Sequence, residues 1–263
     1  MDKKTLSLDG TPIAYERHGD GPTVVLVGGA LCTGATLAPL AAALSDRFGA
    51  LTYDRRGRGE SGDTAPFAVA REVEDIAALI EASGGHAALY GISSGGALAL
   101  EAAASGLPVS QVVVYETPFA VYEGGGKERL EYTERLTELL GQGRRGDAVE
   151  LFMELAGTPR EMIAGARRSP GWPDMEAIAP TLAYDNAAMG DGLVPRDRLA
   201  SLTVPVLAVG GGASPEWLRE AARAVADAAP DGSYRTLDGQ THMVDPQVLA
   251  PVLAEFFGGS GRR

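Results

Sequence analysis

The feature that most constrains the fold of this chain is the segment at residues 91–95, GISSG, where two serines stand between glycines. A continuous apolar run at 87–90 precedes it and predicts a buried strand, while an alanine-rich run at 97–104 follows it and predicts a helix. Small residues at this junction let the two backbones pass close together. The turn between them would hold Ser93 in a strained conformation and expose its hydroxyl. The segment therefore predicts a strand, a sharp turn with Ser93 at its apex, and a helix.

Continuous apolar runs recur along the chain and alternate with helical patterns such as 69–82 and 94–104. The apolar runs lie at 24–27, 50–53, 87–90, 112–115 and 206–209. Strands that are apolar throughout are buried on both faces, which is typical of a parallel sheet covered by helices. At the N-terminus, 6–8 and 13–15 flank a turn at Asp9-Gly10 and predict an antiparallel hairpin. We therefore expect an α/β fold with a doubly wound, mostly parallel sheet.

The alternation breaks between Pro118 and Pro195, where no strand is predicted. Helical patterns occur there instead, at 127–140, 147–156, 159–167 and 175–189. This organisation predicts a core formed by 1–117 and 196–263, and a helical cap formed by 118–195. The amphipathic faces of the cap helices must cover some other surface, and we expect that surface to be the mouth of a site at Ser93. The alternative is a second helical layer that plays no part in substrate choice.

The composition restricts the classes of partner. A formal net charge of -12 disfavours binding to nucleic acid and to anionic membranes. The single cysteine, Cys32, rules out an intramolecular disulfide and fits a reducing cytoplasm, and no signal peptide or long apolar segment is predicted. With three histidines and no clustered ligand spacing, we expect neither a metal nor another cofactor. The predicted partner is a small-molecule substrate, and a homodimer remains open.

In its strand-to-helix context, the segment 91–95 resembles the nucleophile elbow of the α/β-hydrolases, with Ser93 in the position of the nucleophile. The resemblance covers 6–117 and 204–257, and it provides no motif for the cap. It implies a serine hydrolase in which a histidine and an acid activate the serine, in the chain order serine, acid, histidine.

A second segment, 54–61, is similar to the D-x-R-G-x-G-x-S pattern that members of the family often carry. Its glycines and charges suit a tight loop beside the crevice at the strand ends. We interpret Asp54, Arg55 and Ser61 in this segment as structural residues.

The chain order implied by the family leaves His242 as the base. His18 lies in a polar turn after the hairpin, and His86 precedes the strand that leads to Ser93, at the opposite edge of the sheet. Only His242 follows the nucleophile, in the segment before the last helix. We therefore predict that His242 takes the proton of the serine hydroxyl.

The acid stands in an unusual place. In most α/β-hydrolases an aspartate follows the strand equivalent to 206–209, but here the loop after that strand holds only Glu216. Glu116 follows the preceding strand and would face the same crevice. Some members, including haloalkane-dehalogenase-like enzymes, are similar in carrying the acid there. We predict Glu116 as the acid that orients His242, with Glu216 and Asp238 as alternatives.

An acyl-transfer site also needs hydrogen-bond donors for an oxyanion. The resemblance implies two backbone donors, the N–H groups of Ser94 and of Ala30, which lies in the loop 28–32. Members of the family usually begin this loop with His-Gly, whereas Gly28 stands in the histidine position here. Backbone donors do not depend on that side chain, so we expect the oxyanion hole to be retained.

These residues predict hydrolysis of an ester, thioester or lactone bond in a small, largely apolar substrate. Apolar residues expected to line the pocket, each of which could equally belong to a core, are Leu31, Phe119, Phe152, Trp172 and Met243. Two other classes of function stay open. A cofactor-free lyase, cyclase or isomerase could use the same scaffold, and a non-catalytic protein could use it to bind a small molecule.

Overall fold

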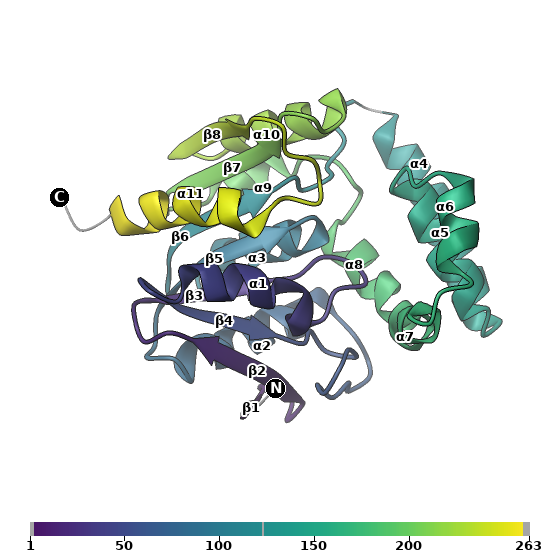
Figure 1. The fold of residues 1–263 in the computed structure, drawn as a ribbon, viewed down its shortest axis with the longest axis horizontal. Coiled ribbons are helices and arrows are strands. Elements are labelled where there is room, and N and C mark those ends of the chain that lie inside the picture. The colour runs from purple at the N-terminus through teal and green to yellow at the C-terminus, as the bar shows by residue number, and fades with distance from the viewer. Residues whose placement is uncertain (1–2, 123, 260–263) are drawn as a thin grey trace.

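The computed structural model describes residues 3–122 and 124–259, so the ends of the expected core, 1–2 and 260–263, lie outside the described residues. It shows an eight-stranded sheet with helices on both faces (Figure 1). The strands are β1 (Lys3–Leu6), β2 (Pro12–His18), β3 (Thr23–Val27), β4 (Gly49–Tyr53), β5 (Ala87–Ile92), β6 (Val109–Tyr115), β7 (Val206–Gly211) and β8 (Gly232–Leu237). The helices of the core are α1 (Gly34–Leu44), α2 (Val69–Glu81), α3 (Ser94–Ala104), α9 (Arg196–Ala200), α10 (Glu216–Ala228) and α11 (Pro246–Gly258).

The strand order across the sheet is β1-β2-β4-β3-β5-β6-β7-β8. β1 and β2 are antiparallel to their neighbours, and β3 to β8 run parallel to one another. The chain goes from β3 to β4 on one side and then returns to place β5 on the other side of β3. Such a reversal opens a crevice at the carboxyl ends of the two strands, where α/β proteins bind their ligands. The predicted doubly wound, mostly parallel sheet is confirmed.

The two faces of the sheet carry separate hydrophobic clusters. α1 and α11 pack on one face, and α2, α3 and α10 pack on the other. Every residue of β3 and of β4 is buried, as the continuous apolar runs predicted. β8 was not among those runs, because this edge strand is mostly exposed or only partly buried and its sequence is correspondingly polar.

The connection between the two strands of the N-terminal hairpin is longer than predicted. β1 ends at Leu6, and 7–11 link it to β2, so Leu8 lies in the turn rather than in a strand. Leu6 and Leu8 are 67% and 80% exposed. The antiparallel pairing itself is present.

The segment 118–195, called the helical insertion below, contributes no strand to the sheet in its described part, although a single bridge pairs Ala120 with Leu193. Its helices are α4 (Gly125–Gly141), α5 (Arg145–Leu155), α6 (Arg160–Ala166), α7 (Trp172–Ile178), the 3-10 helix η1 (Ala179–Thr181) and α8 (Leu182–Ala188). They share a small hydrophobic cluster of their own. Figure 1 shows them to one side of the sheet, with α8 nearest the core.

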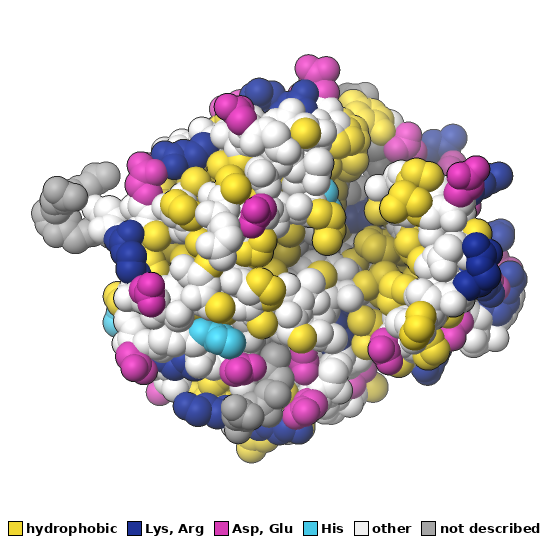
Figure 2. Space-filling view, in the orientation of Figure 1, with side chains coloured by type: hydrophobic (Ala, Val, Ile, Leu, Met, Phe, Trp, Pro, Cys, Tyr) yellow, Lys and Arg dark blue, Asp and Glu magenta, His cyan; other side chains and the backbone are white. Residues whose placement is uncertain are grey.

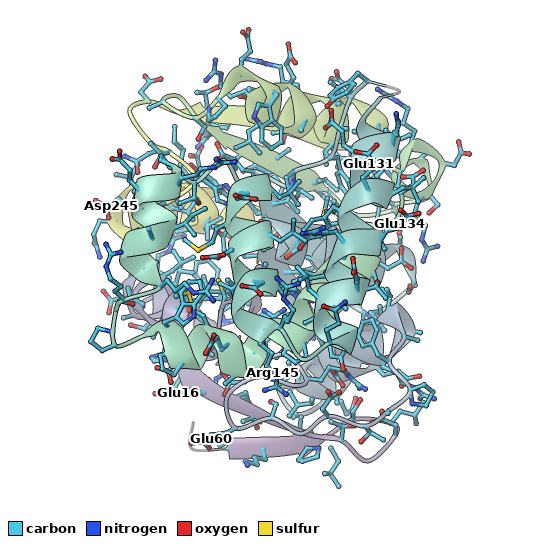
Figure 3. All side chains as sticks on the ribbon, turned by 90° about the vertical axis from the view of Figure 1, so that its right-hand side faces the viewer. Glu16, Glu60, Glu131, Glu134, Arg145 and Asp245 are labelled. Carbon is cyan, nitrogen blue, oxygen red and sulfur yellow. The ribbon has the colours of Figure 1, made fainter. Side chains whose placement is uncertain are left out.

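Seen from the side of the insertion, its helices lie across the sheet (Figure 3). Figure 2 shows a hollow between the core and the insertion that is lined mainly by hydrophobic side chains. In the part of the chain that the structure describes, no helix combines the length and apolar character needed to cross a membrane.

Candidate active site

Ser93 lies between β5 and α3 with φ 57° and ψ -131°, a backbone conformation that residues with a side chain rarely adopt. Two glycines permit the turn. A Cβ atom on Gly91 would lie 2.4 Å from the carbonyl oxygen of Gly95, and one on Gly95 would lie 2.4 Å from the carbonyl oxygen of Val27. The predicted strand, sharp turn and helix are therefore present, and the small residues serve the close passage of the backbones.

Three residues other than glycine have a positive φ in the described part of the chain: Leu31 (56°), Ser93 (57°) and Glu116 (45°). They follow β3, β5 and β6, which are adjacent in the sheet. Strained backbone of this kind costs free energy and persists where the surrounding structure holds it in place, often at functional sites. The three positions coincide with the predicted oxyanion loop, the predicted nucleophile and the predicted acid.

Glu116 is fully buried, and both of its carboxylate oxygens have partners. Oε2 lies 2.9 Å from Nδ1 of His242, and Oε1 accepts a 2.7 Å hydrogen bond from the amide of Gly211. Burial alone would raise the pKa of Glu116, but its hydrogen bonds, that from His242 first, outweigh burial and lower the pKa below its ordinary value. Glu116 is therefore held as a carboxylate against one ring nitrogen of His242, which leaves Nε2 for another partner.

The loop that carries His242 is held by contacts with the ends of β6 and β7. The hydroxyl of Tyr115 donates a 2.6 Å hydrogen bond to the carbonyl of Thr241. A Cβ atom on Gly211 would lie 2.4 Å from the carbonyl oxygen of Gln240, so glycine lets β7 approach this loop closely. The loop therefore rests on the ends of β6 and β7, where Glu116 also lies.

The other two candidate acids lie elsewhere. Asp238 and Glu216 are exposed, and among the described residues neither forms a hydrogen bond or ion pair with His242. No hydrogen bond joins Ser93 to His242 within 3–122 and 124–259 either. Catalytic hydrogen bonds are often long in the absence of substrate and shorten when it binds.

The loop after β3 lies directly against the serine. A Cβ atom on Gly29 would be 2.9 Å from Cβ of Ser93. The next amide, that of Ala30, donates to no acceptor among the described residues. The amide of Ser94 opens α3, where the positive end of the helix dipole favours negative charge. The loop that holds Ala30 and the N-terminus of α3 thus both lie next to Ser93.

Two buried arginines from the segment 54–61 hold the carbonyl groups of that loop. Nη1 of Arg58 donates to the carbonyls of Gly29 (2.6 Å) and Cys32 (3.1 Å), and Nη1 of Arg55 donates to the carbonyl of Gly28 (3.2 Å). These contacts engage the carbonyl groups of Gly28, Gly29 and Cys32 with buried guanidinium groups and so fix the conformation of the loop.

A residue that sequence reasoning missed, Asp185 of α8, completes this network. Its Oδ1 lies 2.5 Å from Nη1 of Arg55 and accepts a 2.8 Å hydrogen bond from the Ser94 hydroxyl, and its Oδ2 lies 2.7 Å from Nη2 of Arg58. Burial alone would raise the pKa of Asp185, but the charges of Arg58 and Arg55 outweigh it and lower the pKa. Arg55 is also paired with Glu72, at 2.7 and 2.8 Å. No sequence motif marks Asp185, because its partners are far away in the chain.

The structure separates the residues that were expected to line the pocket. Trp172 is buried in the hydrophobic cluster of the insertion, and Leu31 and Phe152 pack against that cluster. Phe119 is buried in the core cluster on the face of α2 and α3, and Met243, next to His242, is 84% exposed. Leu31, Phe152 and Trp172 are thus brought together, whereas Phe119 and Met243 lie apart from them.

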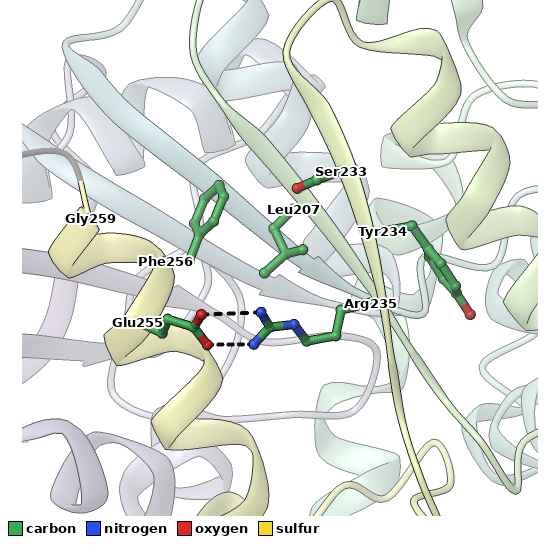
Figure 4. Close-up of a pocket in the computed structure, with 7 residues that line it drawn as sticks. All are labelled: Leu207, Ser233, Tyr234, Arg235, Glu255, Phe256 and Gly259. Carbon is green, nitrogen blue, oxygen red and sulfur yellow. Dashed lines mark hydrogen bonds and ion pairs between the residues drawn. The ribbon is translucent and has the colours of Figure 1, made fainter. Parts of the chain in front are cut away.

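A shallow depression elsewhere on the surface has no part in this arrangement (Figure 4). It is lined by Leu207, Ser233, Tyr234, Arg235, Glu255, Phe256 and Gly259, which belong to β7, β8 and the end of α11. A 2.7 Å ion pair between Arg235 and Glu255 crosses it. None of the candidate catalytic residues borders it.

Residues 24–252 match the sequence profile of the Alpha/beta hydrolase family, so the chain belongs to this family. It is 30% identical over 254 residues to a 2-(acetamidomethylene)succinate hydrolase from Mesorhizobium japonicum, covering 90% of this chain and 88% of that protein. Its fold is similar to the crystal structure of an alpha/beta hydrolase from Sphaerobacter thermophilus, with 52% identity, a TM-score of 0.89 and coverage of 97% and 100% of the two chains. The fold of an enol-lactonase from Burkholderia xenovorans is also similar, at 22% identity, a TM-score of 0.71 and coverage of 97% and 99%.

Proposed function

We propose that this member of the family is a serine hydrolase that cleaves an ester, thioester or lactone bond in a small, largely apolar substrate. The observation that carries the proposal is the 2.9 Å contact between the buried Glu116 carboxylate and Nδ1 of His242, at the same sheet edge as the strained Ser93. A serine, a histidine and an acid that follow parallel strands of one sheet are the set that acyl transfer requires.

In the proposed reaction, Oγ of Ser93 attacks the carbonyl carbon while Nε2 of His242 takes the hydroxyl proton. The carbonyl π electrons move to the oxygen, which accepts hydrogen bonds from the amides of Ser94 and Ala30. The electrons then return, the bond to the leaving alcohol, thiol or ring oxygen breaks, and His242 gives that group its proton. Water repeats the sequence on the acyl-Ser93 intermediate and releases the acid. Glu116 stabilises the imidazolium form of His242 in both steps.

The relatives support carbonyl chemistry at this scaffold. One is named for hydrolysis of a succinate derivative and another for an enol-lactone. We propose further that the helical insertion, 118–195, acts as a cap over the site, because α8 contacts Ser94 and the insertion borders the hollow in Figure 2. Leu31 and Phe152, which are only partly buried, would supply apolar surface on that side.

A fluorophosphonate probe tests the proposal directly, because it reacts only with an activated serine. We expect one probe per chain, attached to Ser93, together with turnover of short 4-nitrophenyl esters. A folded protein that resists the probe and turns over no ester would contradict hydrolysis and support a binding protein. Labelling of Ser93 without ester turnover would instead support a lyase, cyclase or isomerase.

A further inference from the structure

Arg129 lies on the face of α4 that turns toward the core. Its neighbours on that face, three and four residues later, are the buried Tyr132 and the partly buried Thr133. The hydroxyl of Thr133 accepts a 2.8 Å hydrogen bond from the side-chain amide of Asn186. Asn186 follows Asp185, which bonds to the hydroxyl of Ser94. This face of α4 therefore stands beside the part of α8 that docks at the elbow.

The side chain of Arg129 is held along its length. A Cβ atom on Gly192 would lie 3.2–3.4 Å from Cβ, Cγ and Nε of Arg129. The alkyl part of the Arg129 side chain therefore packs directly against the backbone of Gly192. The carbonyl of Gly192 accepts a 2.7 Å hydrogen bond from the amide of Ala120, four residues beyond Glu116. The Arg129 guanidinium carbon lies 6.0 Å from the ring centroid of Tyr132. The guanidinium is thus placed near Gly192 and the segment that follows β6.

The positive charge of Arg129 has no carboxylate partner among the described residues, unlike the charges of the buried arginines nearby. Arg55 and Arg58 are paired with Glu72 and Asp185, so those four buried charges cancel. No carboxylate of the described residues lies within 4.0 Å of the Arg129 guanidinium, and none of its N–H groups forms a hydrogen bond within 3–122 and 124–259. Burial lowers the pKa of Arg129, while the charge of Asp185 is among the effects that oppose this shift. A partly buried cation without an anion is costly unless a ligand supplies one.

We infer that Arg129 binds a carboxylate on the acyl part of the substrate, so that the enzyme acts on half-esters, thioesters or lactones of dicarboxylic acids. The inference rests on the proposed function, because the acyl part is defined by attack at Ser93. A carboxylate suits the guanidinium, which can donate two parallel hydrogen bonds to its oxygens. One surplus positive charge also matches the single negative charge of a carboxylate better than the larger charge of a phosphate.

Two matched esters test this inference by kinetics. Mono-4-nitrophenyl glutarate carries a free carboxylate, and methyl 4-nitrophenyl glutarate carries a neutral group of similar size. We expect the unaltered enzyme to prefer the anionic ester in kcat/KM, and Arg129→Gln to reduce that preference about tenfold or more, since a charge-assisted hydrogen bond is lost. Arg129→Lys should retain part of the preference.

Arg145 provides the matched control. It is an exposed arginine of the same insertion, on the outer helix layer in Figure 3, and it lies at the start of α5. Arg145→Gln removes the same net charge and should leave the preference unchanged. An equal loss in Arg145→Gln and Arg129→Gln would assign the effect to general electrostatics and overturn the inference, as would an unchanged preference in Arg129→Gln.

Binding separates this inference from the proposed hydrolysis. Titration calorimetry on Ser93→Ala protein should show that monomethyl glutarate binds more tightly than dimethyl glutarate. In the double variant that also carries Arg129→Gln, this difference in affinity should disappear. If this holds while no ester is turned over, the carboxylate subsite stands and hydrolysis fails. If esters are turned over but the two glutarates bind equally or not at all, hydrolysis stands and the subsite is wrong.

Discussion

The hydroxyl of Ser94 donates a 2.8 Å hydrogen bond to Oδ1 of Asp185, a residue 91 positions later in the chain. Ser94 follows the proposed nucleophile, and Asp185 belongs to α8 of the helical insertion. The same carboxylate is paired with Arg55 and Arg58, which hold the loop after β3 by its carbonyl groups. One side chain of the insertion therefore connects both backbone segments that would form the oxyanion hole.

Ser94→Ala tests the value of this connection, because it removes the hydroxyl and keeps the backbone N–H. Asp185 would retain its two arginines, so the fold should lose only about 1.5–3 kcal/mol, the contribution of a hydrogen bond to a charged group. We expect kcat for 4-nitrophenyl esters to fall about tenfold with KM little changed, because the donor is less well positioned in the transition state. Unchanged kcat in a folded variant would show that the connection serves stability alone.

Ser93→Ala tests the nucleophile. Turnover of short 4-nitrophenyl esters should fall by about a millionfold, the loss seen when a member of a catalytic triad that acts as a unit is removed. The melting temperature should change little, because the hydroxyl of Ser93 forms no hydrogen bond among the described residues. Retention of more than a few per cent of the activity in a clean preparation would remove Ser93 from this role.

Glu116→Gln tests the acid. The substituted amide keeps the size of the side chain, but its NH2 group must face either the Gly211 amide or Nδ1 of His242, where the carboxylate now accepts both contacts. We expect kcat to fall about ten-thousandfold, as for the loss of the acid in other triads. The exposed residues Glu216 and Asp238 supply the controls, as Glu216→Gln and Asp238→Asn. If one of the controls shows the large loss instead, the acid is misassigned.

Acid stability should depend on the same carboxylate. The native pKa of Glu116 lies below its ordinary value of 4.5, because its hydrogen bonds outweigh burial. Such a group stabilises the fold above that value, and this contribution is lost as the pH falls through the lowered native pKa. Urea midpoints should therefore decrease on acidification below about pH 5, and they should decrease less steeply in Glu116→Gln. Parallel curves for the two proteins would contradict this prediction.

Trp172 should matter more for stability than for selectivity. Only 5% of its surface is exposed, and it packs inside the hydrophobic cluster of the insertion. Trp172→Ala should cost about 3–5 kcal/mol of folding free energy, as large-to-small substitutions of buried aromatic residues do. Chemical denaturation measures this cost, and Trp172→Phe should recover part of it. A stable Trp172→Ala protein with altered acyl-chain preference would instead place Trp172 at the pocket.

The local patterns of the chain predicted the fold of the core and the serine elbow. Strands buried on both faces leave continuous apolar runs, which is why β3 and β4 could be recognised. The partly exposed edge strand β8 leaves no such run and was missed. Glu116 was found through its place at the end of a strand, and its 2.9 Å contact with His242 agrees with that prediction, although its catalytic role awaits the substitutions above.

Residues that act through distant contacts could not be predicted in this way. Asp185 and Arg129 lie in the insertion, where the sequence shows only amphipathic helices. Their importance depends on how α4 and α8 are placed over the strand ends, which no local pattern encodes. The interpretation of Arg55 as structural is consistent with its contacts to Gly28, Glu72 and Asp185, but the sequence did not indicate that the same arginine joins the core to the insertion.

The ion pairs of Asp185 also determine how a substrate can enter. If the insertion swung away as one rigid lid, Asp185 would leave Arg58 as an unpaired buried charge, whereas Arg55 would keep its pair with Glu72. Breaking such a pair costs about 3–5 kcal/mol, so only about one molecule in a hundred to one in a few thousand would be open in this way. Movement confined to α4, α5 and α6 leaves α8 in place and avoids that cost. Entry should therefore proceed through displacement of these outer helices, with α8 as the fixed wall of the passage.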